Sequence, residues 1–428
     1  MKTIGIGVAG AGTVGGTLVA RLVADRAAVT ARTGLDLEVR LVAVSDLDKK
    51  RSINVPKSML TDDAMDLVTD DRIDLVVEVM GGLEPAGSLV LAALQAGKPV
   101  VTANKELMAA RGPDLIAAAA EAGMPLLFEA AVGGGIPIIR PLMETLAGER
   151  IDRVLGIVNG TTNFILTRMA ENGTDYSDAL AEAQTLGYAE PDPTADVTGA
   201  DAAAKAVILA GLAFGVWIGA DAVHTEGIDG LTAEDLATAH RLGFVVKLLA
   251  VAEHTPGGVV ARVHPTMIPA AHPLASIRGA TNAIFIEGSS VGELLFAGPG
   301  AGGAPTATSV LGDVIDAARE LLSGSISGPR VKAEVGKRGE FGDLRTQWCL
   351  RLDVEDSPGV LAQIAGVFGA AGVSIKSVRQ DGRGDRATVV IVTHSATEAA
   401  QQSARAALAA LPVVAEVASA IRVEGDES

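Results

Sequence analysis

An apolar strand, a glycine-rich turn and a helix follow one another at the N-terminus, and this succession limits the possible folds more than any other stretch. Residues 2–9 are predicted to form a buried strand, residues 10–15 have the pattern Gly-x-Gly-x-x-Gly, and a helical run extends from residue 14 to about 26. Glycines in such a turn let the backbone approach a pyrophosphate, whose charge the helix N-terminus attracts. We therefore predict a dinucleotide site, the alternative being an ordinary glycine-rich turn. Its expected contact residues are Gly10, Ala11, Gly12, Thr13, Val14 and Gly15.

Strands and helices continue to alternate as far as residue 130. Strands are predicted at 37–44, 74–80, 99–103 and 125–130, and helices at 85–96 and 105–122. This alternation is typical of a doubly wound parallel sheet, in which ligands bind at the carboxyl ends of the strands. Thr102 and Lys105 follow such a strand and are predicted to lie beside the cofactor. Because the helix dipole disfavours a cation in the first turn, Lys105 is more simply explained as a ligand contact than as a surface lysine.

The residues after the second strand leave the type of dinucleotide open. Asp46 is suited to the ribose hydroxyls of NAD, although it lies later than the usual ~20 residues after the last glycine. Lys49, Lys50 and Arg51 follow closely and are suited to the 2′-phosphate of NADP, unless they are solvated loop charges. The predicted cofactor is therefore NAD or NADP.

An acidic loop at residues 187–199 leads directly into an apolar helix. Pro191 and Pro193 prevent a helix from running through the loop, and the helix is predicted from residue 200 to about 214. Asp201 and Lys205 lie one turn apart on the same helix face, and no other residue between 200 and 220 is charged. This helix therefore carries two opposite charges into an apolar setting.

The Asp201–Lys205 pair has a simple explanation and a catalytic one. On a surface, an ion pair with this spacing would contribute only ~0.3–0.5 kcal/mol. The helix has no polar face for such a pair, however, and burying a charge costs several kcal/mol unless the charge is paired or used. Desolvation would also lower the pKa of the lysine towards that of a useful proton donor. We therefore predict that the pair is catalytic.

Beyond residue 130 the pattern changes to an α+β arrangement. The segment 129–137 contains three consecutive glycines and is predicted to be either a hinge or a loop whose carbonyls face a ligand or ion. The residues at 159–163, after a strand at 153–158, can cap a helix or bind a polar substrate. Further strands of a mixed sheet are predicted at 245–253, 259–263, 283–287 and 294–297. A flexible loop at 298–305, followed by a helix at 308–322, is either a linker or a backbone contact with the cofactor, at Gly302.

The last part of the chain is predicted to be a unit of its own. Residues 324–346 are a polar connector without apolar periodicity, which indicates a domain boundary. The following residues predict the order βαββαβ, a small α/β sandwich. The expected division is a dinucleotide domain at 1–130 completed by a helix near 305–323, a substrate and dimerisation domain at 131–304, the connector, and a regulatory domain at 347–428.

Composition excludes some partners and compartments. The net charge of −17 disfavours nucleic acid, which requires basic patches. The longest apolar run, residues 206–220, is shorter than the ~20 residues of a membrane span, so no membrane segment is expected. Cys349 is the only cysteine and cannot form an intrachain disulfide, which fits a reducing cytoplasm.

Several long motifs occur in an order that resembles the homoserine dehydrogenase family over essentially the whole chain. They are the N-terminal glycine turn, Thr102-Ala103-Asn104-Lys105, Gly133–Gly135, Asn159-Gly160-Thr161-Thr162-Asn163 and Gly187 through Lys205. The tail resembles an ACT domain, through Asp356-x-Pro358-Gly359-Val360-Leu361 and Gly372-Val373-x-Ile375. The resemblance implies NAD(P)H-dependent reduction of L-aspartate 4-semialdehyde to L-homoserine, on the route to threonine and methionine.

The resemblance also implies roles for individual residues. Lys205 and Lys105 match catalytic lysines, with Lys205 the usual proton donor, and Asp201 matches an acid of the substrate site. Glu190 matches the residue that binds the substrate amino group. Further expected substrate contacts are Tyr188, Gly160, Thr161 and Asp196. A structural sodium site is implied at Glu129 with the carbonyls of Val132, Gly134 and Ile136. Homodimers or homotetramers, and feedback inhibition by threonine through the tail, are expected as well.

Two other functions remain in competition. Another ACT-containing dehydrogenase, such as a hydroxy-acid enzyme, would need a catalytic histidine, and no histidine of this sequence has a suitable context. A non-catalytic sensor of nucleotide and amino acid would have no reason to keep Asp201 and Lys205 on a buried helix face.

Overall fold

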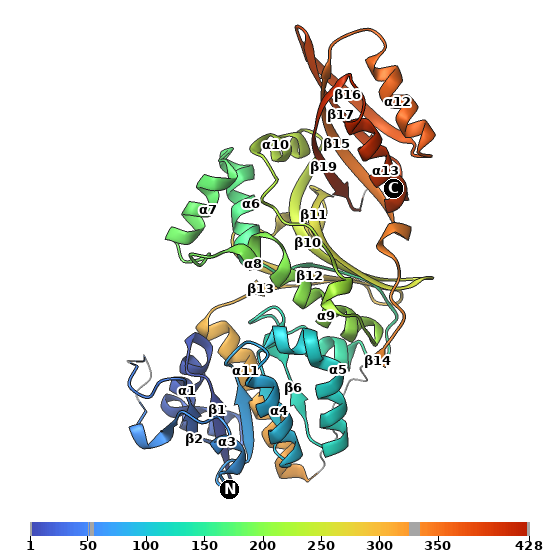
Figure 1. Cartoon of the computed structure of the whole chain (residues 1–428). Coiled ribbons are helices and arrows are strands. Elements are labelled where there is room, and N and C mark those ends of the chain that lie inside the picture. Colours follow the sequence, from blue (N-terminus) through green and yellow to red (C-terminus); the bar gives the residue numbers. More distant parts are fainter. Residues whose placement is uncertain (1, 50, 52–54, 325–333, 426–428) are drawn as a thin grey trace.

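The computed structural model describes residues 2–49, 51, 55–324 and 334–425. Lys50, residues 325–333 of the predicted connector and the last three residues of the tail lie outside the described residues. Figure 1 shows three successive layers, with the N-terminal sheet at one end, a second sheet in the middle and the C-terminal tail at the other end. None of the described helices is both long and apolar enough to cross a membrane.

The N-terminal sheet has six strands, all parallel, in the order β3-β2-β1-β4-β5-β6. These strands are β1 (Thr3–Ala9), β2 (Asp36–Ala43), β3 (Leu60–Thr61), β4 (Leu75–Glu78), β5 (Val100–Thr102) and β6 (Leu126–Leu127). The order reverses its direction between β1 and β4, and in such sheets the crevice outside the strand ends at this point binds ligands. The predicted doubly wound parallel sheet is confirmed.

Helices cover both faces of this sheet. On one face, α1 (Thr13–Ala24) and α11 (Gly303–Ser323) pack together over the buried side chains of β1 and β4. The other face is covered by α3 (Asp66–Thr69), α4 (Ala86–Gln95) and α5 (Lys105–Ala122). The long helix α11 returns to the first sheet after the chain has built the second one (Figure 1).

Some boundaries in this region differ from the prediction. The first helix ends at Ala24, and α2 (Arg26–Thr33), which the sequence did not predict, follows directly. The helix expected from residue 308 begins at Gly303, and strand β13 continues to Pro299. The flexible loop predicted at 298–305 is therefore wrong in length, because strand pairing and an early helix start take up most of it.

The second sheet is mixed and has the central order β13-β12-β7-β10-β11. Its strands are β7 (Ile151–Ile157), β10 (Phe244–Thr255), β11 (Gly258–Pro269), β12 (Thr281–Gly288) and β13 (Gly292–Pro299). Strands β10 and β11 form one long hairpin that pairs Thr255 with Gly258 and Phe244 with Pro269, so β11 extends well past its predicted end at residue 263. The helices of this region are α6 (Gly160–Asn172), α7 (Tyr176–Thr185), α8 (Thr194–Val197), α9 (Ala200–Phe214) and α10 (Ala233–Arg241).

The tail has the predicted order βαββαβ. Its elements are β15 (Arg345–Glu355), α12 (Val360–Ala370), β16 (Ile375–Arg383), β17 (Arg386–Thr393), α13 (Glu398–Ala409) and β19 (Val414–Val423), with a short β18 (Ala396–Thr397) before α13. It has a hydrophobic core of its own, built around Trp348, Ile364 and Phe368.

The tail also joins the second sheet. Strand β19 pairs in parallel with β11, which places Thr266 opposite Arg422 and Met267 opposite Val423. The tail strands therefore extend the second sheet to β13-β12-β7-β10-β11-β19-β15-β17-β16. Within the connector, strand β14 (Glu334–Val335) pairs with β8 (Val216–Trp217), directly after α9.

Candidate active site

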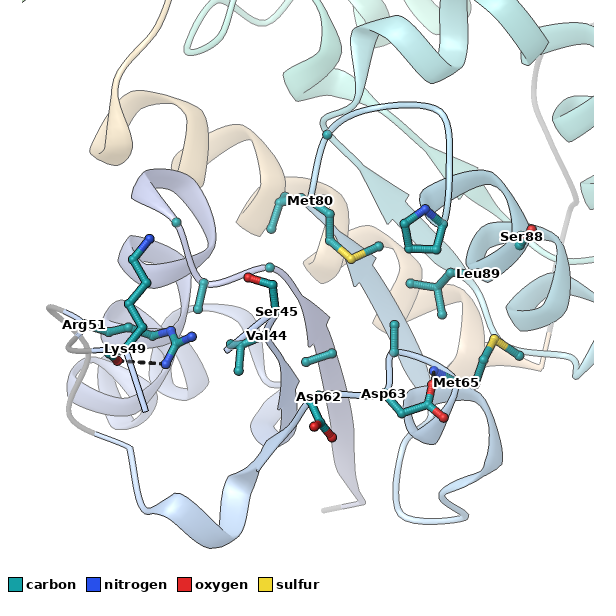
Figure 2. A pocket seen from close by; sticks show the side chains of 18 of the residues that line it. Val44, Ser45, Lys49, Arg51, Asp62, Asp63, Met65, Met80, Ser88 and Leu89 are labelled. Atoms are coloured by element: carbon teal, nitrogen blue, oxygen red, sulfur yellow. Dashed lines mark hydrogen bonds between the residues drawn. The ribbon is translucent and has the colours of Figure 1, made fainter. Parts of the chain in front are cut away.

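A cavity of about 920 Å³ lies at the carboxyl ends of the first sheet (Figure 2). Its lining includes Gly10, Ala11, Gly12 and Thr13 of the turn after β1, and Met80 and Gly81 of the loop after β4. The cavity thus lies where β1 and β4 diverge, the place at which this type of sheet binds dinucleotides.

Glycine is required at three positions of the turn, for a different structural reason at each. Gly10 has φ +104°, and a Cβ there would lie 2.7 Å from the carbonyl oxygen of Val79. A Cβ on Gly15 would lie 2.0 Å from the oxygen of Gly10, so only glycine lets α1 pack this closely against the turn. Gly12 lines the cavity, and no atom lies within 4 Å of the place of its missing Cβ. These are the tight turn, the close helix packing and the open approach that a pyrophosphate requires, so the residues fit a dinucleotide.

Buried polar side chains hold the loop after β4. Glu78 is fully buried and accepts hydrogen bonds from the backbone N–H of Met80 at 2.8 Å and from the Thr102 hydroxyl at 2.5 Å. Asn104 caps α5 by accepting from the N–H of Leu107 at 3.0 Å, and it donates to the oxygen of Gly82 at 2.7 Å. Sequence reasoning placed Thr102 and Asn104 beside the cofactor but missed Glu78. A charged residue closing an otherwise apolar strand was the available signal for Glu78.

The ribose end of the cavity is lined by Ser45, Lys49 and Arg51. Asp46 is absent from the cavity wall, and its Oδ1 accepts hydrogen bonds from the backbone N–H groups of Asp48 at 2.8 Å and Lys49 at 3.2 Å. The guanidinium of Arg51 donates to the Asp46 carbonyl oxygen. Asp46 thus shapes the loop that presents the two basic side chains.

The first turn of α11 lies against α1. A Cβ on Gly303 would lie 2.7 Å from the Thr17 hydroxyl oxygen, and Arg21 donates to the Thr308 hydroxyl at 2.8 Å. Gly302, with φ +116°, precedes this helix. The predicted contact residue Gly302 is therefore close to the glycine turn, although it does not line the cavity.

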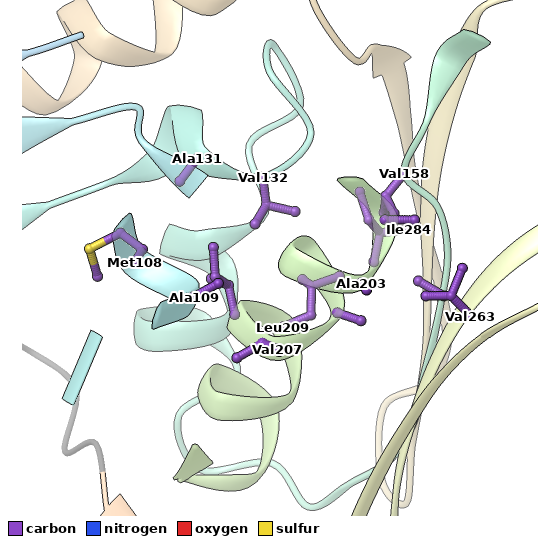
Figure 3. Packing of buried hydrophobic residues seen from close by; sticks show 14 of the residues in the cluster. Met108, Ala109, Ala131, Val132, Val158, Ala203, Val207, Leu209, Val263 and Ile284 are labelled. Atoms are coloured by element: carbon purple, nitrogen blue, oxygen red, sulfur yellow. The ribbon is translucent and has the colours of Figure 1, made fainter. Parts of the chain in front are cut away.

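Helix α9 carries Asp201 and Lys205 into the space between the two sheets. Figure 3 shows its residues Ala203, Val207 and Leu209 packed between α5 and the second sheet. The predicted bounds of this helix agree with the structure, and left-handed glycines end it on both sides, Gly199 with φ +86° and Gly215 with φ +68°. Because both faces are covered by apolar side chains, the two charged residues are only 9% exposed.

One carboxylate joins two lysines. Asp201 Oδ2 lies 2.6 Å from Lys205 Nζ, and Asp201 Oδ1 lies 2.9 Å from Lys105 Nζ, which comes from the first residue of α5. Lys205 also donates to the carbonyl oxygen of Val158 at 2.6 Å. The predicted catalytic residues Lys105, Asp201 and Lys205 thus form one cluster, although the sequence paired only the last two.

The charges of this cluster depend on one another. Burial by itself would raise the pKa of Asp201, but the ammonium groups of Lys205 and Lys105 outweigh it and hold that pKa well below its usual range. Burial would likewise lower the pKa of Lys105, yet the charge and hydrogen bond of Asp201 prevail and raise it. Asp201 and Lys105 are therefore charged at neutral pH.

Asn159 connects the cluster to the start of α6. Its Nδ2 donates to Asp196 Oδ1 at 2.6 Å and to Asp201 Oδ2 at 2.9 Å. Its Oδ1 accepts from the backbone N–H of Thr162 at 2.9 Å and so caps α6. The sequence predicted a helix cap or a contact with a polar substrate at 159–163, and Asn159 makes the cap. Through its Nδ2, the predicted substrate residue Asp196 is placed beside Asp201.

The remaining predicted substrate residues lie around the acidic loop. Thr161 donates to the carbonyl oxygen of Tyr188 at 2.6 Å, and the Tyr188 ring lies 4.8 Å from that of Phe164 on α6. Gly160 is the first residue of α6 and has no room for a Cβ, which would approach the oxygen of Ala280 to 2.7 Å. Glu190 is exposed, and within the described residues its carboxylate has no hydrogen-bond or ion-pair partner.

The loop predicted to bind sodium is centred on a buried carboxylate. Glu129 is 5% exposed and accepts hydrogen bonds from the backbone N–H groups of Ile138, Ile139 and Arg140 at 2.6–2.8 Å. The carbonyl oxygen of Gly134 accepts from the Ser309 hydroxyl at 2.7 Å. In the part of the chain that the structure describes, Glu129 has no basic ion-pair partner.

Comparison with known proteins decides the family. Residues 137–315 match the family described as homoserine dehydrogenase, residues 10–129 match its NAD-binding domain, and residues 350–413 match the ACT domain. A homoserine dehydrogenase of Corynebacterium glutamicum is 49% identical over 99% of this chain and 96% of that protein. The chain belongs to the homoserine dehydrogenase family.

Solved homoserine dehydrogenases share all or most of this architecture. The Thiobacillus denitrificans enzyme has a TM-score of 0.93 at 40% identity and covers 99% of both chains. A hyperthermophilic archaeal homoserine dehydrogenase in complex with NADPH has a TM-score of 0.62 at 29% identity, covering 74% of this chain and 98% of that one. This homoserine dehydrogenase is thus an NAD(P)-dependent oxidoreductase that acts on a CH–OH group and carries a C-terminal ACT domain.

Proposed function

We propose that Lys205 is the proton donor in the interconversion of L-aspartate 4-semialdehyde and L-homoserine, and that Asp201 and Lys105 hold it in place. The observation that supports this most is the buried carboxylate of Asp201, which is shared by ammonium groups from α5 and α9. When bound, the nicotinamide cofactor supplies the hydride for the aldehyde carbon.

The hydrogen-bond inventory of Lys205 supports its role. An ammonium group has three N–H donors. Asp201 and Val158 take two of them, which leaves one for the aldehyde oxygen. Such a donor stabilises the negative charge that develops on this oxygen during hydride transfer and then delivers the proton. Lys105 makes one ion pair, and its side chain is 38% exposed, so it remains available to substrate or cofactor.

We assign the substrate's ammonium end to Glu190 and its polar groups to Tyr188, Gly160, Thr161 and Asp196. The unpaired carboxylate of Glu190 and the position of Asp196 beside Asp201 support this assignment. Fixing the end of the substrate remote from the aldehyde would orient the reacting carbon.

The proton-donor assignment is tested with Lys205→Ala. We expect the variant to lose most of kcat for NADPH oxidation with aspartate semialdehyde while NADPH still binds, measured by nucleotide fluorescence. Normal turnover in a folded variant would refute the role of Lys205. Absence of turnover in the unmodified chain, with nucleotide still bound, would instead favour the sensor.

For the cofactor we propose NADP rather than NAD. Lys49 and Arg51 line the cavity and supply positive charge for a 2′-phosphate. Asp46, the residue suited to ribose hydroxyls, instead accepts hydrogen bonds from backbone N–H groups of its own loop. A higher kcat/KM with NADPH than with NADH is expected, and the reverse order would overturn this choice.

A sodium ion at Glu129 with the carbonyls of Val132, Gly134 and Ile136 remains a proposal. Its support is the buried carboxylate without a basic partner, together with oxygen donors of the kind that hard cations prefer. The Ser309 bond leaves one lone pair on the Gly134 oxygen for an ion. A higher unfolding midpoint in NaCl than in choline chloride at equal ionic strength would support it, and equal midpoints would dismiss it.

We also propose a homodimeric or homotetrameric cytoplasmic enzyme whose tail binds an amino acid, threonine being the first to test. Exposed Leu361 and Val378 on the tail, and Leu295 on the edge strand β13, support self-association. The three family matches, at residues 10–129, 137–315 and 350–413, support a division into residues 1–130 with 305–323, 131–304 and 347–428. Light scattering, and turnover with and without millimolar threonine, test the assembly and the effector.

A further inference from the structure

Arg422 lies at the seam where the tail strand β19 joins β11. It is 2% exposed, and its guanidinium carbon lies 5.0 Å from the ring centroid of Trp348 and 5.2 Å from that of Phe341. It donates to both carboxylate oxygens of Glu226 at 2.8 and 2.9 Å and to Glu398 at 2.5 Å. Glu398 belongs to the tail, but Glu226 belongs to the second domain. Arg422 therefore bonds the tail to the segment that contains Glu226.

The segment around Glu226 is itself fixed to the substrate region. It follows β9 (His224–Thr225), which pairs with β11, and the backbone N–H of Glu226 donates to the oxygen of Val263 at 2.8 Å. Two residues later, the N–H of Ile228 donates to the oxygen of Val197 at 2.9 Å. A Cβ on Gly227 would lie 2.3 Å from that same oxygen, so the contact allows no other residue without a shift.

Val197 is the last residue of α8, and it connects this segment to the lysine cluster. The residue before it is Asp196, and Gly199 begins the turn into α9 and Asp201. A Cβ on Gly199 would lie only 3.0 Å from the Thr225 methyl carbon, so β9 and the corner between α8 and α9 are in close contact. Both Asp196 and Asp201 are bonded by Asn159 across this corner.

We infer that Arg422, a residue of the ACT tail, is a positioning residue for the reaction: through Glu226 it holds the corner that sets Asp196 and Asp201 against Lys205. The inference rests on the proposed role of the lysine cluster. Removing the charge of Glu226 weakens the two charge-assisted hydrogen bonds by which Arg422 holds this segment, while Arg422 keeps its pair with Glu398. The segment 224–228 would then move away from Val197, and the catalytic geometry would loosen without the loss of any residue that touches substrate.

The test compares Glu226→Gln with Arg351→Gln. Glu226→Gln keeps the shape of the side chain and leaves the Arg422–Glu398 pair within the tail intact. Arg351 offers a matched control, since it also joins the tail to the second domain, through Asp235 on α10 at 3.0 Å. That ion pair has no contact with the segment 224–228 among those described.

We expect Glu226→Gln to lower kcat/KM for aspartate semialdehyde by about tenfold, a typical size for coupling through a packed network. The loss should divide between kcat and the KM of the semialdehyde and leave the KM of NADPH unchanged. Arg351→Gln should reduce the unfolding midpoint at least as much and change kcat/KM by less than about twofold. The double variant Glu226→Gln/Arg422→Gln should be no slower than its slower single variant.

Two results would overturn the inference. One is unchanged semialdehyde kinetics in Glu226→Gln. The other is an equal loss of kcat/KM in Glu226→Gln and in Arg351→Gln, which would show general damage to the seam. Neither depends on which lysine donates the proton, so an active Lys205→Ala variant refutes the proposed function separately.

Discussion

Lys105 and Asp201 lie on helices that cover different sheets of the molecule, yet their ammonium and carboxylate groups lie 2.9 Å apart. Lys105 begins the helix that covers the first sheet, and Asp201 lies on the helix that covers the second. The same carboxylate holds Lys205 with its other oxygen, at 2.6 Å. One carboxylate therefore links the two layers and aligns the two lysines.

Asp201→Asn should disable catalysis through both lysines. The amide keeps the size of the side chain but removes the counter-charge of the buried Lys205 ammonium and the half-buried Lys105 ammonium, so that their desolvation is no longer compensated. We expect kcat to fall by about 10²-fold or more, with a lower unfolding midpoint and little change in the Kd of NADPH. Asp221→Asn, at an 83% exposed side chain, is the control and should leave kcat unchanged. A nearly normal kcat for Asp201→Asn would remove the lysine cluster from the mechanism.

The spacing of Asp201 and Lys205 could be predicted because it is local. A helix with 3.6 residues per turn brings positions four apart to one face, and glycines on either side mark its ends. The contribution of Lys105 and Asn159 could not be seen in this way. Their contacts with Asp201 depend on how the two layers pack, and the periodicity of the sequence does not predict such contacts between distant segments.

The joining of the tail to the second sheet was missed for a related reason. The order βαββαβ is encoded by local alternation, and it was predicted correctly. The pairing of β19 with β11 involves only Thr266 and Met267 opposite Arg422 and Val423. An arginine and a glutamate at the end of an apolar strand, Arg422 and Glu424, were the only sign that this strand has a buried polar partner.

Arg51→Ala tests the preference for NADP. Arg51 lines the ribose end of the cavity, and an arginine can hold a phosphate with two parallel hydrogen bonds. We expect the KM of NADPH to rise by about tenfold, and the KM of NADH to change by less than about twofold, because hydrogen bonds to charged groups contribute ~1.5–3 kcal/mol. Lys57→Ala is the control, since that side chain is 83% exposed and outside the cavity wall. Equal effects on both cofactors would show that Arg51 only shapes its loop.

Gly211→Ala should destabilise the junction between the two sheets. The ring of Trp217 is wedged between Gly112 on α5 and Gly211 on α9, and a Cβ on Gly211 would lie 2.2 Å from its Cε3 atom. Overpacking of this kind costs ~1–3 kcal/mol, more than the ~1 kcal/mol that alanine gains over glycine within a helix. Gly366→Ala, within α12 and with nothing within 4 Å of its Cβ, should be neutral or stabilising. Thermal unfolding compares the two, and a Gly211→Ala protein as stable as the control would show that Trp217 can move aside.

Asp313 should make the stability of the enzyme fall as the pH rises towards neutrality. It is 2% exposed, and its carboxylate accepts from the Glu129 N–H at 2.8 Å and from Arg140 Nη2 at 3.0 Å. Burial, aided by the negative charge of Glu129, raises its pKa from 3.8 to about 7. Between these two values the unfolded chain has released the proton and the folded chain still holds it, so unfolding becomes easier with each pH unit.

The variant Asp313→Asn cannot titrate and therefore isolates this effect. It should begin with an offset, because an amide replaces the carboxyl group that bonds Glu129 and Arg140, but its stability relative to the unmodified enzyme should increase from pH 5 to pH 7. The expected change is about 2–3 kcal/mol over these two units, at ~1.4 kcal/mol per unit, and it should level off above pH 8. Chemical unfolding of both proteins at several pH values measures the difference. A difference that stays constant with pH would mean that Asp313 is already ionised in the folded enzyme at pH 5, stabilised there by Arg140.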